Sequence, residues 1–332
     1  MKAYFFLLIL VFLISCSNNN DKTPKNLPDV KIISVPFYKE LFETNVDSIP
    51  TKVPAFIYRY SPFFELFCSH VINIGYPEEK RFNLLLQQFV SDFRMRNVYN
   101  EINKKFPDTK EIDYKLEKAF KYFSFYFPNL PVPKVFYYHG GFNHSIIATD
   151  SVLGIGLDKY LGQDYDYYFK LGLPQYQRSK MRKEYIPIDA LRYYISGLYP
   201  FPFEQDNVFS HIIYEGEIQY VLKKIFPDES DTLLFGYSEN QLQWCKKNEQ
   251  NMWKYLIEKK KLFSNDLLDI KRYTQDAPFT STFPRESPGR AAVWIGYNIV
   301  AEFMKKNKNL SLHNLLTIKD YQHIFQVSEY NP

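Results

Sequence analysis

The side chains best placed for chemistry lie in the second half of the chain, where His211 and Glu215 stand four residues apart. Their segment has helical periodicity, so both point from one helical face and are close enough to share a metal ion. Two ligands do not make a metal site, however, and a hydrogen-bonded pair is the simpler interpretation. The pair is therefore kept as a candidate site without being assigned as a metal centre.

Arg290 is the second candidate, in the segment Ser287-Pro-Gly-Arg290 that precedes a run of small and apolar residues. Pro288 suits the first position of a helix. Arg290 would then occupy the first turn, where the helix dipole disfavours a cation, so a carboxylate partner is expected. A structural ion pair is the main interpretation, and an arginine that faces a ligand is the alternative.

The third candidate is a turn at Gly140-Gly141, which two histidines flank. His139 and His144 could bind a metal ion, although solvated histidines in a turn are the simpler interpretation. The polar residues of this region that we retain as candidates for a cleft are Asn143, His144, Asp150 and Asp158.

Composition and motifs exclude several classes of function. The 332 residues include 41 Lys and Arg against 37 Asp and Glu, a net charge of +4 without a dense basic stripe, which argues against a nucleic-acid partner. The chain has no CxxC, no HExxH and no Gly-rich nucleotide loop. We therefore assign no catalytic residue, metal or cofactor, apart from a covalent lipid. Cys68 and Cys245 could form a disulfide or remain two buried thiols.

An α+β fold that is mostly helical must position these candidates. Residues 30–60 are predicted to be extended, and residues 133–157 contain three β-rich runs that predict a three-stranded meander. Val152, Ile155 and Leu157 are expected to be buried, with Asp158 at the end of the last strand. Helices are predicted over residues 77–93, 109–127, 187–197, 206–225, 238–262 and 287–306. No linker or repeat divides residues 31–332, which predicts a single globular domain.

The first thirty residues are predicted to direct the protein to a membrane. The apolar run from Ala3 to Ile14 would span ~18 Å as a helix, which is too short for a bilayer core of roughly 30 Å but typical of a signal peptide. It ends in Leu13-Ile14-Ser15-Cys16, which looks like a bacterial lipobox. We therefore predict a signal peptide over residues 1–15, a lipid on Cys16, and a polar tether over residues 16–30. An ordinary signal peptide with a chance cysteine is the alternative.

Together these motifs resemble the gliding motility-associated lipoprotein GldB family of Bacteroidetes. The resemblance covers about residues 130–308. It implies a membrane-anchored protein that surface gliding needs and that is linked to type IX secretion, facing the periplasm from the outer membrane rather than the inner one. Its implied partners are the membrane, through the lipid, and envelope or motility proteins. The matching segments include Gly141-Phe-Asn-His-Ser145, residues 150–162, Pro187-x-Asp189-x-x-Arg192 and Glu286-Ser-Pro-Gly-Arg290.

The layout is also similar, more distantly, to predicted zinc peptidases that carry an HExxH helix. In that comparison Ile188 and Arg192 replace the two metal-binding histidines, and Asp189 replaces the catalytic glutamate. Glu215 stands where the third metal ligand would be. Isoleucine cannot bind zinc, and the permanent charge of arginine excludes it. The comparison therefore implies a degenerate zinc-peptidase-like site, with candidate residues Asp189, Arg192, His211, Glu215 and Arg290.

Two classes of function remain open at this point. One is a non-catalytic lipoprotein that binds partners in the cell envelope, and the other is a metallopeptidase-like hydrolase with a rearranged site on His211 and Glu215. A degenerate site predicts that Arg192 lies within hydrogen-bonding distance of Glu215, because a buried carboxylate needs a cation. Arg290 is the competing partner for that carboxylate.

Replacing Cys16 tests the predicted anchor. Cys16→Ala removes the thiol that would accept diacylglycerol, so we expect the variant to retain residues 1–15 and to lose its acyl chains. Detergent phase partitioning and the intact mass of the purified protein measure both effects. Ser17→Ala, which leaves the thiol in place, serves as the control. An acylated Cys16→Ala variant would rule out this lipobox.

Overall fold

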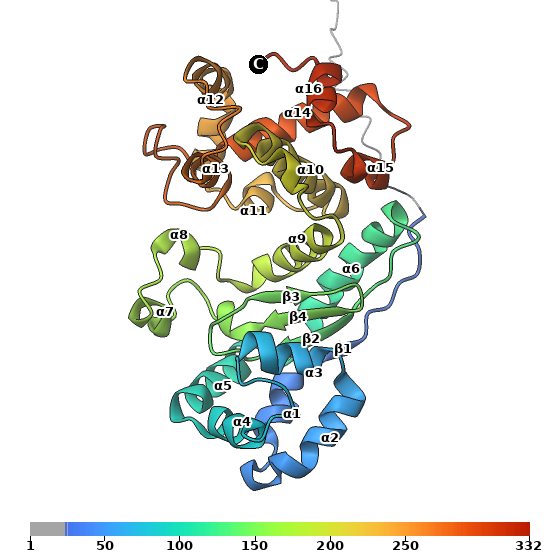
Figure 1. Cartoon of the computed structure of the whole chain (residues 1–332), viewed down its shortest axis with the longest axis vertical. Helices are drawn as coiled ribbons and strands as arrows, with labels where there is room; N and C mark the ends of the chain where they lie inside the picture. The colour runs from blue at the N-terminus through green and yellow to red at the C-terminus, as the bar shows by residue number, and fades with distance from the viewer. Residues whose placement is uncertain (1–23, 25) are drawn as a thin grey trace, which may run out of the picture.

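Helices surround one small sheet in the computed structural model, which confirms the predicted, mostly helical α+β class (Figure 1). The model describes residues 24 and 26–332, so the predicted signal peptide and Cys16 lie outside the described residues. Cys68 and Cys245 are both buried free thiols. No helix within the described part of the chain is both long and apolar enough to cross a membrane.

The helices form two groups, one on each side of the sheet segment in the sequence. The first group comprises α1 (Phe37–Glu43), α2 (Ile49–Tyr60), α3 (Phe63–Leu66), α4 (Phe82–Ser91), α5 (Phe93–Lys105) and α6 (Lys110–Tyr126). The second comprises α7 (Asp166–Lys170), α8 (Gln175–Arg178), α9 (Ile186–Leu198), α10 (Val208–Ile225), α11 (Asp231–Phe235), α12 (Glu239–Glu258), α13 (Leu267–Thr274), α14 (Ala292–Lys306), α15 (Leu312–Thr317) and α16 (Tyr321–Ser328).

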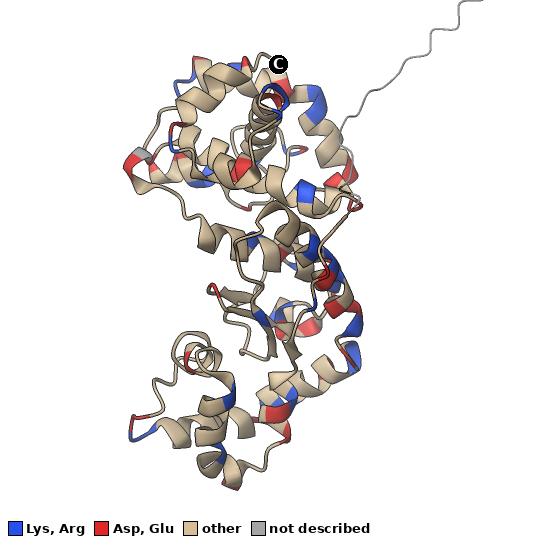
Figure 2. Ribbon diagram, turned by 90° about the vertical axis from the view of Figure 1, so that its right-hand side faces the viewer, with Lys and Arg blue, Asp and Glu red and all other residues tan. Residues whose placement is uncertain are grey.

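The sheet lies in the middle of an elongated molecule. Figure 1 shows α1–α5 at one end, α10–α16 at the other, and α9 between the sheet and the second group. Buried apolar side chains from both ends and from the sheet form one connected hydrophobic cluster. Cationic and anionic residues are interspersed along the helices (Figure 2).

The predicted three-stranded meander is wrong in its topology. The strands are β1 (Ser34–Val35), β2 (Lys134–Tyr138), β3 (Ile146–Ala148) and β4 (Val152–Gly156), in the order β1-β2-β4-β3. β2 pairs with β1 and β4 in parallel, and β3 is an antiparallel edge strand. The burial explains the difference, because β4 is buried at every position and β2 at all but its first. Such continuous apolar strands are typical of the middle of a parallel sheet that is covered on both faces.

The burial predicted for the end of the last strand is confirmed. Val152 is 2% exposed, while Ile155 and Leu157 are 0% exposed. Asp158 directly follows β4 and is itself fully buried.

The extended segment predicted over residues 30–60 is mostly helical. The buried face of α2 consists of Ile49, Val53, Phe56 and Tyr60, which follow a helical period of three and four residues. Pro50 lies in the first turn, where its missing N–H is not needed, and Pro54 is tolerated inside the helix. Because prolines usually interrupt helices, these two led to the prediction of an extended segment in spite of the helical spacing of the apolar residues.

The helix predicted over residues 77–93 was also incomplete, because a second helix follows it directly. α4 ends at Ser91, and the carboxylate of Asp92 then accepts hydrogen bonds from the backbone N–H groups of Arg94 and Met95. This cap starts α5. The capping box predicted at Ser238 and Gln241 is present at the start of α12.

α10 and α14 cross with their backbones in contact. A side-chain carbon built on Gly216 would overlap the backbone of Gly296, and one built on Gly296 would overlap the carbonyl oxygen of Ile212. Only glycine fits at these two positions, since the obstructing atoms are backbone and cannot rotate away. The crossing fixes the start of α14 beside the middle of α10.

Gly296→Ala tests how far the fold depends on this crossing. We expect a loss of about 3 kcal/mol in the free energy of unfolding, because the added methyl group forces two backbones apart. Gly197→Ala is the matched control, since Gly197 lies in α9 with no atom within 4 Å of a built side-chain carbon. That variant should gain up to ~1 kcal/mol from helix propensity. Urea unfolding of both variants gives the comparison, and equal stability would contradict the close crossing.

Candidate functional site

The candidate site is centred on the carboxylate of Glu215, which two arginines bind. Nη1 of Arg192 and Nη2 of Arg290 each lie 3.1 Å from Oε2 of Glu215. The expected contact between Arg192 and Glu215 is therefore present, and Arg290 joins it rather than replacing it. The exposed fractions of the three side chains are 18% for Arg192, 26% for Glu215 and 12% for Arg290.

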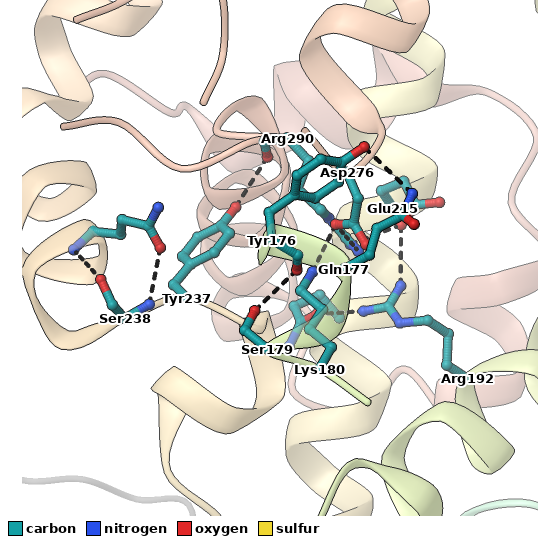
Figure 3. Close-up of polar contacts among 12 residues, drawn as sticks. Tyr176, Gln177, Ser179, Lys180, Arg192, Glu215, Tyr237, Ser238, Asp276 and Arg290 are labelled. Atoms are coloured by element: carbon teal, nitrogen blue, oxygen red, sulfur yellow. Dashed lines mark hydrogen bonds and ion pairs between the residues drawn. The ribbon is translucent and has the colours of Figure 1, made fainter. Parts of the chain in front are cut away.

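Three separate elements supply these side chains. Glu215 lies in the middle of α10 beside Gly216, and Arg192 reaches it from α9 (Figure 3). Arg290 comes from the segment before α14. The predicted helix start at Ser287 is wrong, because α14 begins at Ala292 and Arg290 has a φ of 53°. Arg290 is thus a left-handed residue before the helix and not a cation inside its first turn.

Neighbouring groups hold the left-handed backbone of Arg290 in place. The hydroxyl of Tyr237 donates a hydrogen bond of 3.0 Å to the carbonyl oxygen of Arg290. The preceding Gly289 packs so closely on Ala277 that a side-chain carbon would overlap its backbone. A non-glycine residue with positive φ costs on the order of 1 kcal/mol, so the ion pair and this hydrogen bond must offset that strain.

Further polar groups surround the central carboxylate. Nη2 of Arg192 donates to Oε1 of Gln219 over 2.6 Å. On the side of Arg290, Lys180 donates to Oδ1 of Asp276 over 2.7 Å, and the same oxygen lies 4.0 Å from Nη1 of Arg290. The cluster therefore alternates cations and carboxylates across two helices and three loops.

Burial and mutual repulsion shape the electrostatics of this cluster. Burial lowers the pKa of Arg192, and the nearby charge of Arg290 lowers it further. Burial also lowers the pKa of Lys180, although Asp276 opposes that effect. Burial alone would raise the pKa of Asp276, but Lys180 and Arg290 together hold it below its ordinary value.

Asp189 is the carboxyl group with the most unusual titration in this region. Its Oδ2 accepts a hydrogen bond of 2.9 Å from the hydroxyl of Tyr160. Burial raises the pKa of Asp189 from 3.8 to about 6, while Tyr160, Lys180 and Arg192 favour its ionised form.

These groups line a cavity of about 420 Å³. Its polar wall contains Lys159, Lys180, Asp189, Arg192, Asp276 and Arg290, and its apolar wall contains Ile188, Leu233, Leu234 and Phe235. A second hollow of about 380 Å³ shares Lys180, Gly236 and Asp276 with the first. The two hollows adjoin at Lys180, which packs on Gly236 and donates to Asp276 between them. Together we call them the groove, which lies beside α8 and the end of α11.

His211 does not contribute to this site, against the prediction of a pair with Glu215. Its Nε2 lies 2.7 Å from Oδ1 of Asp206, and its ring stacks on Phe201 with centroids 3.9 Å apart. Within the described residues there is no group of three or more His, Cys, Asp or Glu side chains that could hold a metal ion.

The candidates around the diglycine turn lie away from the cavity lining. Asn143 donates to the carbonyl oxygen of Val71, and His144 and Asp150 are exposed. The buried carboxylate of Asp158 accepts a hydrogen bond from the backbone N–H of Phe142 and lies 3.3 Å from Nδ1 of His139. These contacts hold the turn in shape, which is a structural role.

Several residues of the site were not identified from the sequence. Lys159, Lys180 and Asp276 lie outside any periodic segment, so no pattern pointed to a shared cavity. Asp276 directly precedes Ala277-Pro278. Its place next to a proline-containing loop is the one feature of the sequence that could have marked it as a candidate.

Asp189→Asn tests the electrostatics of the cavity through the pH dependence of stability. Because the folded-state pKa of about 6 exceeds the ordinary 3.8, an ionised Asp189 costs stability above pH 6, and wild type recovers that stability as the pH falls from 6 to 4. Asparagine still accepts the hydrogen bond from Tyr160 but carries no charge. We expect the variant to be more stable than wild type at pH 7.5, by up to ~3 kcal/mol, with a shrinking advantage toward pH 4.

Urea unfolding of both proteins at pH 4.5 and pH 7.5 measures this difference. A stability difference that is the same at the two pH values would contradict the raised pKa of Asp189.

Comparison with known proteins identifies one relationship. Residues 17–332 match the family model described as gliding motility protein GldB. No similar protein was found among curated proteins or among solved structures, and the likeness to zinc peptidases has no support from these comparisons. Because the match covers residues 17–332 of the 332, the chain belongs to the gliding motility protein GldB family.

Proposed function

We propose that this protein is a lipid-anchored component of the cell envelope that acts by binding another envelope protein in its central cavity, rather than by catalysis. Membership of a gliding motility family supports a role in surface movement. The link to type IX secretion and the placement of the folded part in the periplasm, on the outer membrane, belong to the same proposal.

The observation that carries the proposal is the state of the Glu215 carboxylate. Two guanidinium groups bind its Oε2, each at 3.1 Å. A carboxylate in this state is a poor metal ligand, because the two cations occupy the lone pairs of Oε2 and their charges would repel an approaching dication. Glu215, which the comparison of layout placed at the position of a metal ligand, thus holds Arg192 and Arg290 instead.

The rest of the cavity wall also favours binding over catalysis. Among the described residues that line it there is no histidine or cysteine, and Asp189, the carboxyl group whose pKa is raised to about 6, is held by the hydroxyl of Tyr160. Charged hydrogen-bond donors face an apolar wall that includes Leu233 and Phe235. Convergent donors beside an apolar surface are typical of a ligand site.

The metallopeptidase-like alternative would need His211 and Glu215 to share a metal ion. Their partners in the structure are different, since His211 binds Asp206 and Glu215 binds two arginines. Measurement of bound zinc in the purified protein tests this alternative.

Gliding of complemented deletion cells tests the proposal. Arg192→Ala and Arg290→Ala remove binding groups from the cavity, so both should abolish or strongly reduce gliding. The level of anchored protein is raised to that of wild type, which separates lost binding from the lower stability that follows the loss of one ion pair. Arg94→Ala is the matched control, since Arg94 is an exposed arginine beside an aspartate in α5, at the other end of the molecule. That control should glide like wild type.

Metal analysis of the purified full-length protein separates binding from hydrolysis. We expect less than one zinc ion per ten chains, and no cleavage of peptides by the protein. Stoichiometric zinc that disappears in Glu215→Ala, together with zinc-dependent peptide cleavage, would overturn the proposal in favour of the hydrolase. Normal gliding by both arginine variants would overturn the role of the cavity.

A further inference from the structure

The groove has the dimensions of a site for an extended chain. Its first hollow of about 420 Å³ falls within the usual range of ligand cavities, and the second hollow of about 380 Å³ adjoins it where Lys180 packs on Gly236. A small round ligand would fill one hollow and leave the other empty. A segment of peptide in extended conformation can lie across Lys180 and reach both.

Arg192 and Arg290, which line the first hollow, have N–H groups that donate no hydrogen bond to the described part of the protein. Together they donate three hydrogen bonds to protein acceptors, two to Glu215 and one to Gln219. Since every guanidinium carries several N–H donors, most of theirs have no acceptor within the described residues. Nε of Arg290 is buried and has no hydrogen-bond partner. An unmet buried donor of a charged group is costly, and the guanidinium that carries it belongs to a residue that lines the cavity.

A third cation in the same wall is also incompletely paired. Nζ of Lys159 donates to the carbonyl oxygen of Phe142 over 3.2 Å, and within the described residues it lies in no ion pair. Burial lowers the pKa of Lys159, and the charge of Asp158 opposes that effect. An ammonium group whose one acceptor is a backbone carbonyl gains from an anionic acceptor.

The carboxylates in the wall limit the charge of the ligand. Asp189 and Asp276 line the same cavity as the cations, and Glu215 lies behind them. A phosphate dianion would meet repulsion from these carboxylates, whereas a single negative charge matches the small excess of cations. Arginine forks also match the two oxygens of a carboxylate geometrically.

We infer that the groove binds an extended peptide through one carboxylate group, which Arg192, Arg290 and Lys159 receive. The inference rests on the proposed function and names the chemistry of the bound segment. The carboxylate belongs either to a C-terminus or to an acidic side chain, and the experiment distinguishes these two sources.

Calorimetric titration of the full-length protein in detergent micelles tests the inference with four N-acetylated alanine-rich pentapeptides. The first has a free C-terminus, and the second is its C-terminal amide. The third and fourth are amides with a central Asp or Asn. We expect one carboxylate peptide to bind about tenfold more tightly than its neutral counterpart at low salt, with a smaller ratio at 300 mM NaCl. The peptide that shows this preference identifies the source of the carboxylate.

Variants show whether the preference arises in the groove. Arg290→Gln should reduce the affinity for the carboxylate peptide about tenfold. Lys159→Gln should reduce it severalfold without touching the pairs of Glu215, which keeps the test valid if Arg290→Gln fails to fold. Arg94→Gln is the control and should bind like wild type.

Three outcomes would overturn the inference. They are equal affinities for carboxylate and neutral peptides, an unchanged preference in Lys159→Gln, and displacement of the peptide by inorganic phosphate at a lower concentration than by acetate. If carboxylate preference is absent while Arg192→Ala still fails to glide, the inference fails and the binding function stands.

Discussion

The backbone contact between Gly216 and Gly296 is the constraint on which the rest of the site depends. Packed helices usually keep their axes 8–10 Å apart through their side chains, and two facing glycines remove that spacing. α10 is buried on almost every side, against α14, α13, α9 and α6, so its position fixes that of its neighbours. Glu215 directly precedes one glycine, and Arg290 lies just before the helix that carries the other. The short distance between carboxylate and guanidinium is therefore a consequence of how closely the two helices cross.

The charge cluster then connects the sheet to the end of the molecule that α10–α16 form. Arg192 belongs to α9, which packs on β3 and β4, whereas Glu215 belongs to α10 and Arg290 to the loop before α14. Taking three charged groups out of water is costly, and removing one partner of such a cluster leaves an uncompensated charge that costs several kcal/mol. The cluster therefore specifies one relative position of these elements more than it adds to stability. The left-handed backbone of Arg290 fits this view, because its strain is accepted where it brings a second guanidinium to Glu215.

Sequence reasoning succeeded where a periodic pattern or a local rule determined the outcome. The apolar period predicted α9, α10 and α12 within a few residues, and the capping box at Ser238 marked the start of α12 correctly. Prediction from the sequence failed where contacts between residues far apart in the chain determine the structure. Nothing local distinguishes a meander from a parallel pair with β3 at the edge, and Pro50 and Pro54 hid the helical period of α2. The pairing of Arg192 with Glu215 came from an analogy of layout, while Lys159, Lys180 and Asp276 reach the cavity from loops whose course depends on the whole fold.

The arrangement of the cavity suits binding because its cations are held in place before a ligand arrives. A site built from flexible lysines and arginines must order those side chains on binding, at a cost of about 0.5–1.5 kcal/mol for each. Here Glu215 and Gln219 fix the guanidinium of Arg192, and Asp276 fixes Lys180, while other N–H groups remain open. The carboxylates thus orient the donors and also reduce the net charge of the wall, which is what the proposed binding of a single anionic group requires. In this cluster the central carboxylate of Glu215 is engaged in orienting the two guanidinium groups around it.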